Sequence, residues 1–305
     1  MIRFRDASRW YGEVIGLNDV NVEIGPGVTA LLGQNGAGKT TMMRLITGQL
    51  RPTTGRVEVF GENPFANAAI YSRIGYCPAI DSFPEHLTGR QFVHRMARYM
   101  GFHQAEAASR TQKMLERVGM ADRCDKRLRG FSKGMRQRIK LAQAMIHDPE
   151  MLLLDEPLSG LDPVGRREIM DFLQEFADQG KIVLVSSHIL FEVEEMTRSI
   201  LLLHRGRLLA AGDLRSIREL IDRHPHRVRI LTDQAREVAS RLMALPYVIS
   251  VEVDASEKEV EIRTREVDRF YDALPGLVLD ENLRMFGFES PDNNLEAVFQ
   301  YLVEA

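Results

Sequence analysis

Residues 33–41, which read GQNGAGKTT, have the residue types and the spacing to bind a phosphate group. The pattern Gly-x4-Gly-Lys-Thr is matched by Gly33, Gly38, Lys39 and Thr40. Glycines let backbone N–H groups approach an anion closely, and a helix N-terminus adds a partial positive charge. We expect Lys39 to reach the outer phosphates of a nucleotide and the Thr40 hydroxyl to hold a magnesium ion. The alternative is a glycine-rich turn without a ligand.

Two adjacent acidic residues, Asp155 and Glu156, follow the apolar run at residues 151–154. Such a run indicates a strand buried on both faces, as in a parallel sheet. The carboxyl ends of these strands face the ligand crevice in open α/β sheets. Asp155 suits a magnesium contact, through water, and Glu156 suits a general base for an attacking water. The alternative is that one of them only caps the element that follows.

Two further side chains leave their roles open when they are considered alone. His188 comes after the predicted strand at residues 181–185. It could bond a terminal phosphate, but its position by itself favours a structural histidine. Tyr11 precedes the strand that leads into the glycine loop, where an aromatic ring could stack on a purine or simply pack at a strand end.

The elements that position these residues follow from the apolar patterns and the turn residues. The loop lies between a short buried strand at residues 28–32 and a helix beginning at 41–47. We expect further strands at residues 2–4, 20–24, 56–60, 74–77, 181–185 and 200–203. Helical periodicity covers residues 89–100, 104–118, 137–146, 166–179 and 189–196, with a basic loop at 127–138.

The pattern changes after the boundary at residues 224–226, which read HPH. Beyond it we expect strands at residues 228–231, 248–253, 259–263 and 283–288, helices at 234–244 and 267–273, and a closing helix at 294–303. The order strand, helix, strand, strand, helix, strand is typical of a small ferredoxin-like α+β domain. We therefore expect a nucleotide domain over residues 1–215, with a helical subdomain at about 86–148, a linker at 216–226 and an accessory domain at 227–305.

Composition limits the function classes. The chain has 305 residues, 44% hydrophobic and 27% charged, with 40 basic and 43 acidic side chains and a net charge of −3. A broad basic face for nucleic acid is not indicated. Cys77 and Cys124 lack metal or redox spacing, which favours reduced thiols in a cytosolic protein. Neither an apolar signal region nor a run of roughly 20 apolar residues is found, so we expect no membrane-spanning segment.

Taken together, the motifs resemble those of the ATP-binding cassette (ABC) family over residues 1 to about 215. They are the loop at 33–41, FSKGM at 131–135, MLLLDE at 151–156, SGLD at 159–162 and then His188. The resemblance implies an α/β fold, a P-loop NTPase cassette with a mixed sheet, an antiparallel β subdomain and a helical subdomain. It also implies that two cassettes enclose two ATP molecules, each glycine loop facing the serine-containing signature of the partner.

The resemblance assigns roles to individual side chains. It implies that Glu156 and His188 are catalytic, with His188 contacting the γ-phosphate, and that Thr40 and Asp155 hold the metal. Asp162 looks like a residue of the loop that crosses the interface between the two cassettes of the dimer. The ATP contacts that it implies are Tyr11, on adenine, with Gly33, Asn35, Gly36, Gly38, Lys39, Thr40 and Thr41, and then Ser132, Gly134 and Asp162.

The chain departs from the family pattern in two places. Its signature reads FSKGM rather than LSGGQ, a variant that is similar to those of exporters with separately encoded membrane subunits. The family usually has a glutamine at the position of Ala79, where it contacts magnesium and water. An alanine side chain can neither donate nor accept a hydrogen bond. A backbone carbonyl, a water or nearby Asp81 could substitute, or hydrolysis could be slowed.

These features predict an ATP hydrolase that uses ATP and Mg²⁺ and drives a membrane subunit, as in an exporter of the ABC-2 type. The expected partners are a second cassette, most simply a second copy, and a polytopic permease, without nucleic acid. The expected location is cytoplasmic and peripheral on the inner face of the cell membrane. The alternatives are a soluble cassette ATPase acting on translation or DNA, and a low-turnover nucleotide-dependent regulator, which Ala79 would favour. The C-terminal domain could stabilise a dimer or carry regulation.

Overall fold

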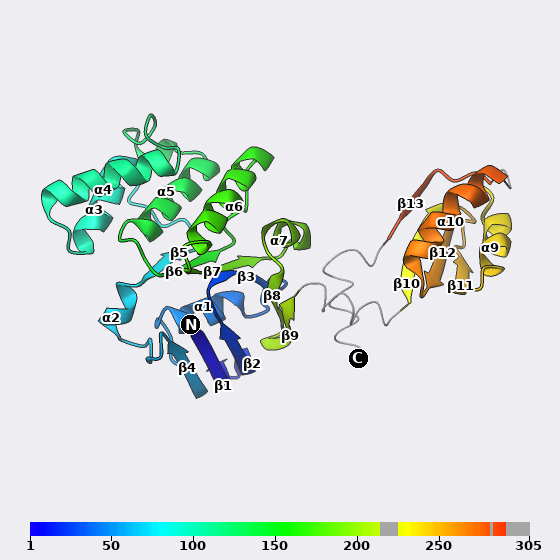
Figure 1. Cartoon of the computed structure of the whole chain (residues 1–305), viewed down its shortest axis with the longest axis horizontal. Coiled ribbons are helices and arrows are strands. Elements are labelled where there is room, and N and C mark those ends of the chain that lie inside the picture. The colour runs from blue at the N-terminus through cyan, green and yellow to red at the C-terminus, as the bar shows by residue number, and fades with distance from the viewer. Residues whose placement is uncertain (214–224, 281–282, 291–305) are drawn as a thin grey trace. The chain divides into compact units, whose positions relative to one another are not determined.

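The computed structural model describes residues 1–213, 225–280 and 283–290 (Figure 1). The chain divides into two compact units, Met1–Asp213 and Leu214–Ala305, which are described separately. Most of the expected linker at residues 216–226 and the whole expected helix at 294–303 lie outside the described residues. None of the helices in the described ranges is long and apolar enough to cross a membrane.

The first unit contains a six-stranded sheet and a separate three-stranded sheet. The larger sheet has the strand order β5-β6-β7-β3-β8-β9 and is parallel except for the pair β8 and β9. Its strands are β3 (Gly27–Leu32), β5 (Ile74–Cys77), β6 (Met151–Asp155), β7 (Ile182–Ser187), β8 (Ser199–His204) and β9 (Arg207–Asp213). The smaller, antiparallel sheet comprises β2 (Val14–Ile24), β1 (Ile2–Tyr11) and β4 (Thr54–Val59). The expected mixed sheet and antiparallel β subdomain are thus confirmed.

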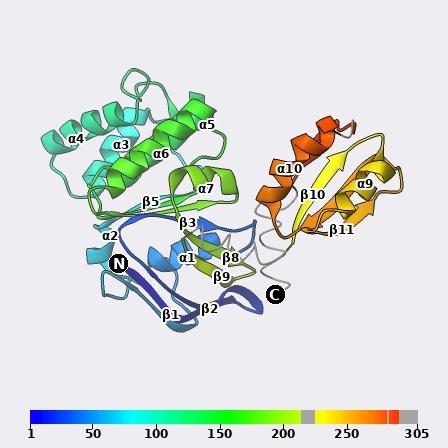
Figure 2. The same cartoon turned by 45° about the vertical axis from the view of Figure 1, so that its right-hand side comes forward.

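Helix α1 (Lys39–Ile46) lies between the two sheets, as Figures 1 and 2 show. Its apolar side chains Met42 and Leu45 are fully buried together with Phe4 of β1 and Leu153 of β6. Both sheets bury one face against α1, and this shared core holds the helix in place between them. The N-terminus of α1 therefore lies at the carboxyl end of β3, which is the edge where the functional side chains gather.

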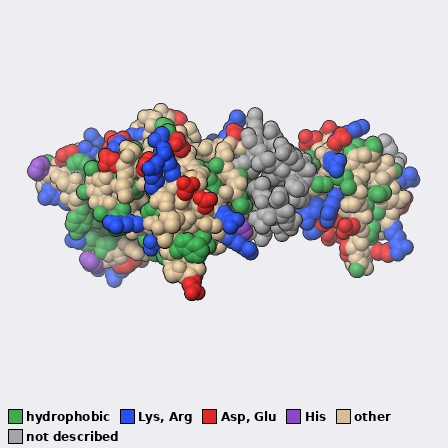
Figure 3. Space-filling view, turned by 90° about the horizontal axis from the view of Figure 1, so that it is seen from below, with side chains coloured by type: hydrophobic (Ala, Val, Ile, Leu, Met, Phe, Trp, Pro, Cys, Tyr) green, Lys and Arg blue, Asp and Glu red, His purple; other side chains and the backbone are tan. Residues whose placement is uncertain are grey.

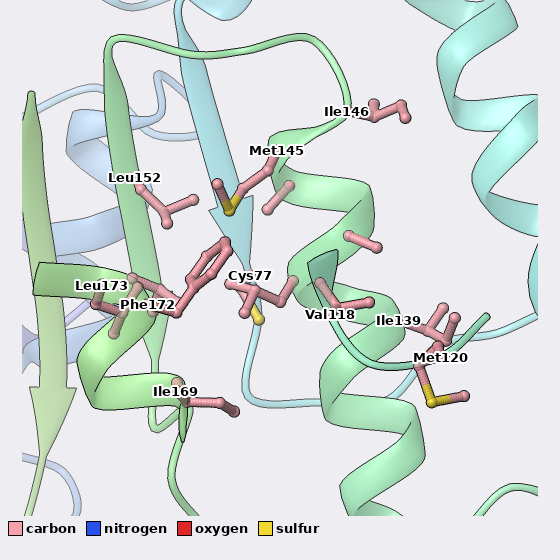
Figure 4. Close-up of a cluster of buried hydrophobic side chains, with 14 of the residues drawn as sticks. Cys77, Val118, Met120, Ile139, Met145, Ile146, Leu152, Ile169, Phe172 and Leu173 are labelled. Atoms are coloured by element: carbon pink, nitrogen blue, oxygen red, sulfur yellow. The ribbon is translucent and has the colours of Figure 1, made fainter. Parts of the chain in front are cut away.

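The helices that follow β5 in the chain cover the opposite face of the large sheet, whereas Ile70 of α2 packs in the core around α1 (Figure 2). In β6, Leu152 and Leu154 point into this second core, whereas Met151 and Leu153 point toward α1. Figure 4 shows Cys77, Leu152 and side chains of α5 and α6 in contact there. The helices of this unit are α2 (Ala68–Tyr71), α3 (Gly89–Tyr99), α4 (Gln104–Arg117), the 3-10 turn η1 (Leu128–Gly130), α5 (Lys133–Met145), α6 (Pro163–Ala177) and α7 (Leu190–Met196).

The expectation of a loop over residues 127–138 is wrong in its second half. Helix α5 begins at Lys133, because the Ser132 hydroxyl accepts a hydrogen bond from the Met135 N–H at 3.3 Å and caps the helix. Gly134 was interpreted as a loop residue, yet it lies in the first turn of α5. The serine of the signature is therefore a helix N-cap, and the helix extends from it to Met145.

The second unit has the expected ferredoxin-like arrangement in its described part. Its antiparallel sheet has the order β11-β12-β10-β13. The elements are β10 (His226–Leu231), α9 (Ala235–Met243), β11 (Val248–Val253), β12 (Glu259–Thr264), α10 (Val267–Asp280) and β13 (Gly287–Glu289). Both helices pack on one face of the sheet, where Val228, Val238 and Phe270 are fully buried. Helix α10 continues past Pro275, further than the expected end at residue 273.

Candidate functional site

The glycine loop connects the end of β3 to the start of α1 and requires glycine at several positions. Gly36 and Gly38 have φ values of 82° and 110°, which L side chains rarely adopt. A Cβ atom on Gly38 would lie 2.6 Å from the carbonyl oxygen of Gly16, and one on Gly33 would lie 2.7 Å from that of Leu203. Larger residues would push the loop off the neighbouring strands, so the glycines fix its curvature.

Lys39 is buried at the first position of α1, and its ammonium group lies inside the loop. Lys39 Nζ donates to the carbonyl oxygens of Gly33 at 2.6 Å and Gln34 at 3.3 Å. It also lies 3.4 Å from a carboxylate oxygen of Glu156. The Lys39 ammonium is therefore held by the loop carbonyl oxygens, next to the carboxylate of Glu156.

Asp155 is buried at the end of β6 and bonds to hydroxyl groups of two other elements. It accepts hydrogen bonds from Thr40 Oγ1 at 2.9 Å and from Ser186 Oγ at 2.7 Å. Burial, with the nearby Asp155 charge, raises the pKa of Tyr76 to about 12, so that this phenol stays neutral. A threonine hydroxyl beside a carboxylate is a hard oxygen donor pair, which suits Mg²⁺ completed by substrate phosphate oxygens. Ser186 was not selected from the sequence.

Glu156 follows β6 in a left-handed backbone conformation, with φ of 51°. Such a conformation is uncommon for residues other than glycine and occurs at functional sites. The Glu156 N–H donates to Ser186 Oγ at 2.8 Å, which holds the turn. Its carboxylate lies between Lys39 and His188, whose Nδ1 is 3.0 Å away. His188 thus comes into contact with Glu156, and its ring remains partly exposed.

Lys39, Asp155 and Glu156 line one open cleft of about 490 Å³, whereas His188 is not among its lining residues and contacts it through Glu156. Its walls are Tyr11, Val14, Ile15, Gly16, Gln34, Asn35, Gly36, Ala37, Gly38, Lys39, Thr40, Thr41, Ala79, Asp155 and Glu156. Tyr11 lies at the rim, with its hydroxyl 3.4 Å from Thr41 Oγ1 and the Arg9 guanidinium 5.1 Å from its ring centroid. A Cβ atom on Gly16 would lie 2.7 Å from the Tyr11 ring, so Gly16 leaves room for it. The cleft combines an exposed aromatic ring, an amide-rich loop, a lysine and two carboxylates.

Comparison with known proteins decides the family. The model of the ABC transporter family matches residues 17–159. The bacitracin transport ATP-binding protein BcrA of Bacillus licheniformis is 37% identical over 212 residues, which are 68% of this chain and 68% of that protein. The chain belongs to the ABC transporter ATP-binding protein family. This ABC protein is the ATP-binding, ATP-hydrolysing subunit of a transporter.

Other relatives extend the likeness of this ABC ATPase. The daunorubicin resistance ATP-binding protein DrrA3 of Streptomyces coeruleorubidus is 32% identical over 304 residues, 97% of this chain and 93% of that protein. That match therefore includes the second unit. A solved structure of an ABC transporter ATP-binding subunit superposes with a TM-score of 0.66 at 30% identity, covering 72% of this chain and 93% of that one. The cassette fold expected from the sequence is confirmed.

Four of the predicted ATP contacts of the ABC cassette are not among the residues that line the cleft described above: Gly33, which belongs to the loop itself, and three residues of other elements. Ser132 caps α5, Gly134 lies in its first turn, and Asp162 caps α6 by accepting from the Gly165 N–H at 3.0 Å. None of the three is among the described residues that line the cleft. The two cap regions lie next to each other, because a Cβ atom on Gly134 would lie 3.3 Å from a methyl group of Leu161. A single chain therefore carries two separate surfaces. One is the cleft at the glycine loop, and the other, the signature surface, contains Ser132, Gly134 and Asp162.

The edge of the cleft at Ala79 is held by Lys140, which belongs to none of the sequence motifs. Lys140 lies in the buried face of α5 and pairs with Asp81, its Nζ 2.8 Å from Oδ1. The same nitrogen donates to the carbonyl oxygens of Pro78 at 3.0 Å and Ala79 at 3.3 Å. The residues three and four positions away in the helix are mostly polar, so no apolar pattern marks this lysine in the sequence. Asp81, which could have replaced the missing glutamine, is thus engaged by Lys140.

Proposed function

We propose that this ABC ATPase energises an exporter of the ABC-2 type, acting as a pair of cassettes on a polytopic permease and hydrolysing magnesium-bound ATP. The observation that carries the ATPase chemistry is that Lys39 and Glu156 line one cleft and that Glu156 contacts both Lys39 and His188. The exporter class rests on the relatives named for bacitracin transport and daunorubicin resistance. In this proposal the chain is peripheral on the cytoplasmic face of the membrane and is attached through the permease.

The residues of the cleft support hydrolysis by in-line attack of water. Loop amides at residues 33–38 and the Lys39 ammonium would bind the phosphates, and Tyr11 would stack on the adenine ring. Thr40 and Asp155 would hold Mg²⁺, which when bound offsets the phosphate charge. Glu156 would take a proton from water as the water oxygen bonds to the γ-phosphorus. The bond from that phosphorus to the bridging oxygen breaks, and ADP leaves with the electron pair.

His188 would act on the same reaction through its contact with Glu156. Its ring nitrogen lies 3.0 Å from the carboxylate, so it can fix the orientation of Glu156 while it faces the γ-phosphate. Lys39 contacts the other carboxylate oxygen at 3.4 Å. Both oxygens of the Glu156 carboxylate are thus contacted, which restricts its orientation.

The paired arrangement would bring the signature surface of one chain to the cleft of another. Ser132 and Gly134 lie at the N-terminus of the 13-residue helix α5, where the helix dipole and free N–H groups favour an anion. In the proposed dimer they would contact the γ-phosphate held by the partner's loop, with Asp162 at the crossing. ABC ATP-binding subunits dimerise and act with membrane permeases, and a homodimer is the simplest case here.

Phosphate release by the purified chain tests this proposal. We expect magnesium-dependent release from ATP, and recovery of the chain with a polytopic membrane protein when native membranes are solubilised in detergent.

The face seen in Figure 3 carries basic and acidic side chains intermixed rather than a broad basic surface. Association with ribosomes or DNA that nuclease treatment abolishes would instead support a soluble ATPase. Binding of ATP without release of phosphate, even with the membrane partner, would support a regulator.

Tyr11→Ala should raise the dissociation constant for ATP about tenfold, because stacking of a base on an aromatic ring contributes about 1–3 kcal/mol. Tyr11→Phe keeps the ring and should stay within about twofold of the unchanged chain. The affinity can be measured by titration with ATP, following the fluorescence of Trp10, the single tryptophan. Tyr71→Ala is a matched control, since Tyr71 is 41% exposed against 40% for Tyr11 and does not line the cleft. Equal affinity of Tyr11→Ala and the unchanged chain would assign Tyr11 to packing alone.

A further inference from the structure

One face of α5 follows β5 and the segment that leaves it. Gln137, Lys140, Ala144 and His147 recur every three or four residues, which places them on the same side of the helix. Gln137 Nε2 lies 3.5 Å from Cys77 Sγ, and a Cβ atom on Gly75 would lie only 2.2 Å from the Ala144 carbonyl oxygen. His147 Nε2, just beyond the helix, is 3.1 Å from the Ile74 carbonyl oxygen. The helix therefore contacts β5 along the whole strand.

Lys140 extends this contact past the strand into residues 78–81. A lysine ammonium has three N–H donors and no acceptor. Here it has three acceptors within reach, the carbonyl oxygens of Pro78 and Ala79 and a carboxylate oxygen of Asp81. A buried charge is tolerated only where it is paired and hydrogen-bonded in this way. The segment 78–81 is thus bent around one buried cation that comes from α5.

This segment forms the edge of the nucleotide cleft next to the catalytic carboxylates. The parallel register of β5 and β6 pairs Cys77 with Leu154. Ala79 comes two residues after Cys77, and Glu156 comes two residues after Leu154. The segments that follow β5 and β6 therefore leave the sheet next to each other. Ala79, Asp155 and Glu156 accordingly line the same cleft. The Ala79 side chain cannot form a hydrogen bond there, so any hydrogen bond that Ala79 makes comes from its backbone.

We propose that Lys140 is a positioning residue for ATP hydrolysis, which fixes the 78–81 segment beside Glu156 and links it to the signature helix. The inference rests on the proposed ATPase function. Because Ser132 caps the helix that carries Lys140, a shift of the signature end of α5 would move the cleft edge with it. Lys140 touches neither the loop nor the catalytic carboxylates among its described contacts, and it acts through the backbone of Pro78 and Ala79.

Lys140→Met tests this inference, since methionine keeps an unbranched apolar chain and removes the ammonium. The Asp81 side chain is 30% exposed, so water can solvate the carboxylate that is left and the variant should fold. We expect kcat for ATP hydrolysis to fall about tenfold, while the dissociation constant for ATP, followed through Trp10 fluorescence, stays within about twofold. Lys181→Met is the matched control, because Lys181 is paired with Asp148 and lies outside the cleft. Its kcat should match that of the unchanged chain.

Asp81→Asn and the double variant Lys140→Met/Asp81→Asn separate positioning from a general loss of stability. If the pair acts as one unit, Asp81→Asn should lower kcat about threefold and the double variant should be no slower than Lys140→Met alone. Independent, multiplying effects would overturn the proposal, as would an unchanged kcat in Lys140→Met. A loss of kcat that matches the unfolded fraction seen by circular dichroism would also overturn it. Absence of hydrolysis by the unchanged chain would instead contradict the proposed function, before any variant is compared.

Discussion

Glu156→Gln is expected to bind ATP as the unchanged chain does while releasing phosphate at least about 100-fold more slowly. A positioned general base contributes about 10²- to 10⁴-fold to a rate, and an amide cannot accept the proton of an attacking water. Glutamine has nearly the same size and shape, so the turn held by the Glu156 N–H and Ser186 should persist. Binding can be followed by Trp10 fluorescence and turnover by steady-state phosphate release.

The same variant should also accumulate as an ATP-bound dimer, because the step that separates the cassettes is blocked. Size-exclusion chromatography with light scattering, with and without ATP and Mg²⁺, measures this. Glu150→Gln is the matched control, since Glu150 is an exposed carboxylate that pairs with Arg73 away from the cleft. Its turnover should equal that of the unchanged chain. Wild-type phosphate release by Glu156→Gln would remove Glu156 from the role of base.

The loop and the two carboxylates could be predicted because each is local in sequence. Gly33, Lys39 and Thr40 lie within eight positions of one another, and Asp155 and Glu156 are adjacent. An apolar strand followed by polar residues also shows which edge of the sheet they occupy. Most strands and helices of both units follow from their apolar periodicity for the same reason, although β9 and α2 were not expected.

Residues that act through distant contacts could not be predicted in this way. Ser186 is 31 positions from Asp155, and Lys140 is 59 positions from Asp81, so only the fold brings each pair together. A serine in an apolar strand and a lysine in an amphipathic helix are ordinary in isolation. The start of α5 was missed because Gly134 usually signals a loop, whereas the Ser132 cap decides the backbone there.

The open question at Ala79 illustrates the same limit. The sequence showed that a side chain able to contact magnesium and water is missing, and it offered Asp81 as one substitute. The structure pairs Asp81 with Lys140 instead, and it places Ala79 among the residues that line the cleft. The segment at residues 78–81 thus lies beside the cleft as expected, but its carboxylate is paired with a lysine of α5. A pair of this kind depends on how closely α5 approaches β5, which no local pattern encodes.

Lys39→Met should abolish measurable ATP binding at concentrations that saturate the unchanged chain, with a dissociation constant raised at least about 100-fold. Hydrogen bonds to charged groups contribute about 1.5–3 kcal/mol each, and a factor of 100 needs about 2.7 kcal/mol. Lys39 is buried inside the loop, so its ammonium is already partly desolvated, and the Gly33 carbonyl oxygen holds it within the loop. A methionine side chain can occupy the same buried space but has no hydrogen-bond donor.

Two further results decide whether this loss is electrostatic or structural. Lys39 also bonds the carbonyl oxygens of Gly33 and Gln34, so its removal could loosen the loop itself. We expect the thermal unfolding midpoint of Lys39→Met to stay close to that of Lys181→Met, in which the lysine–carboxylate pair with Asp148 is broken. If the loop stays folded and ATP still binds at the original affinity, the phosphates are not held by Lys39. Binding would then depend on the loop amides and the N-terminus of α1, which the glycines at 36 and 38 keep accessible.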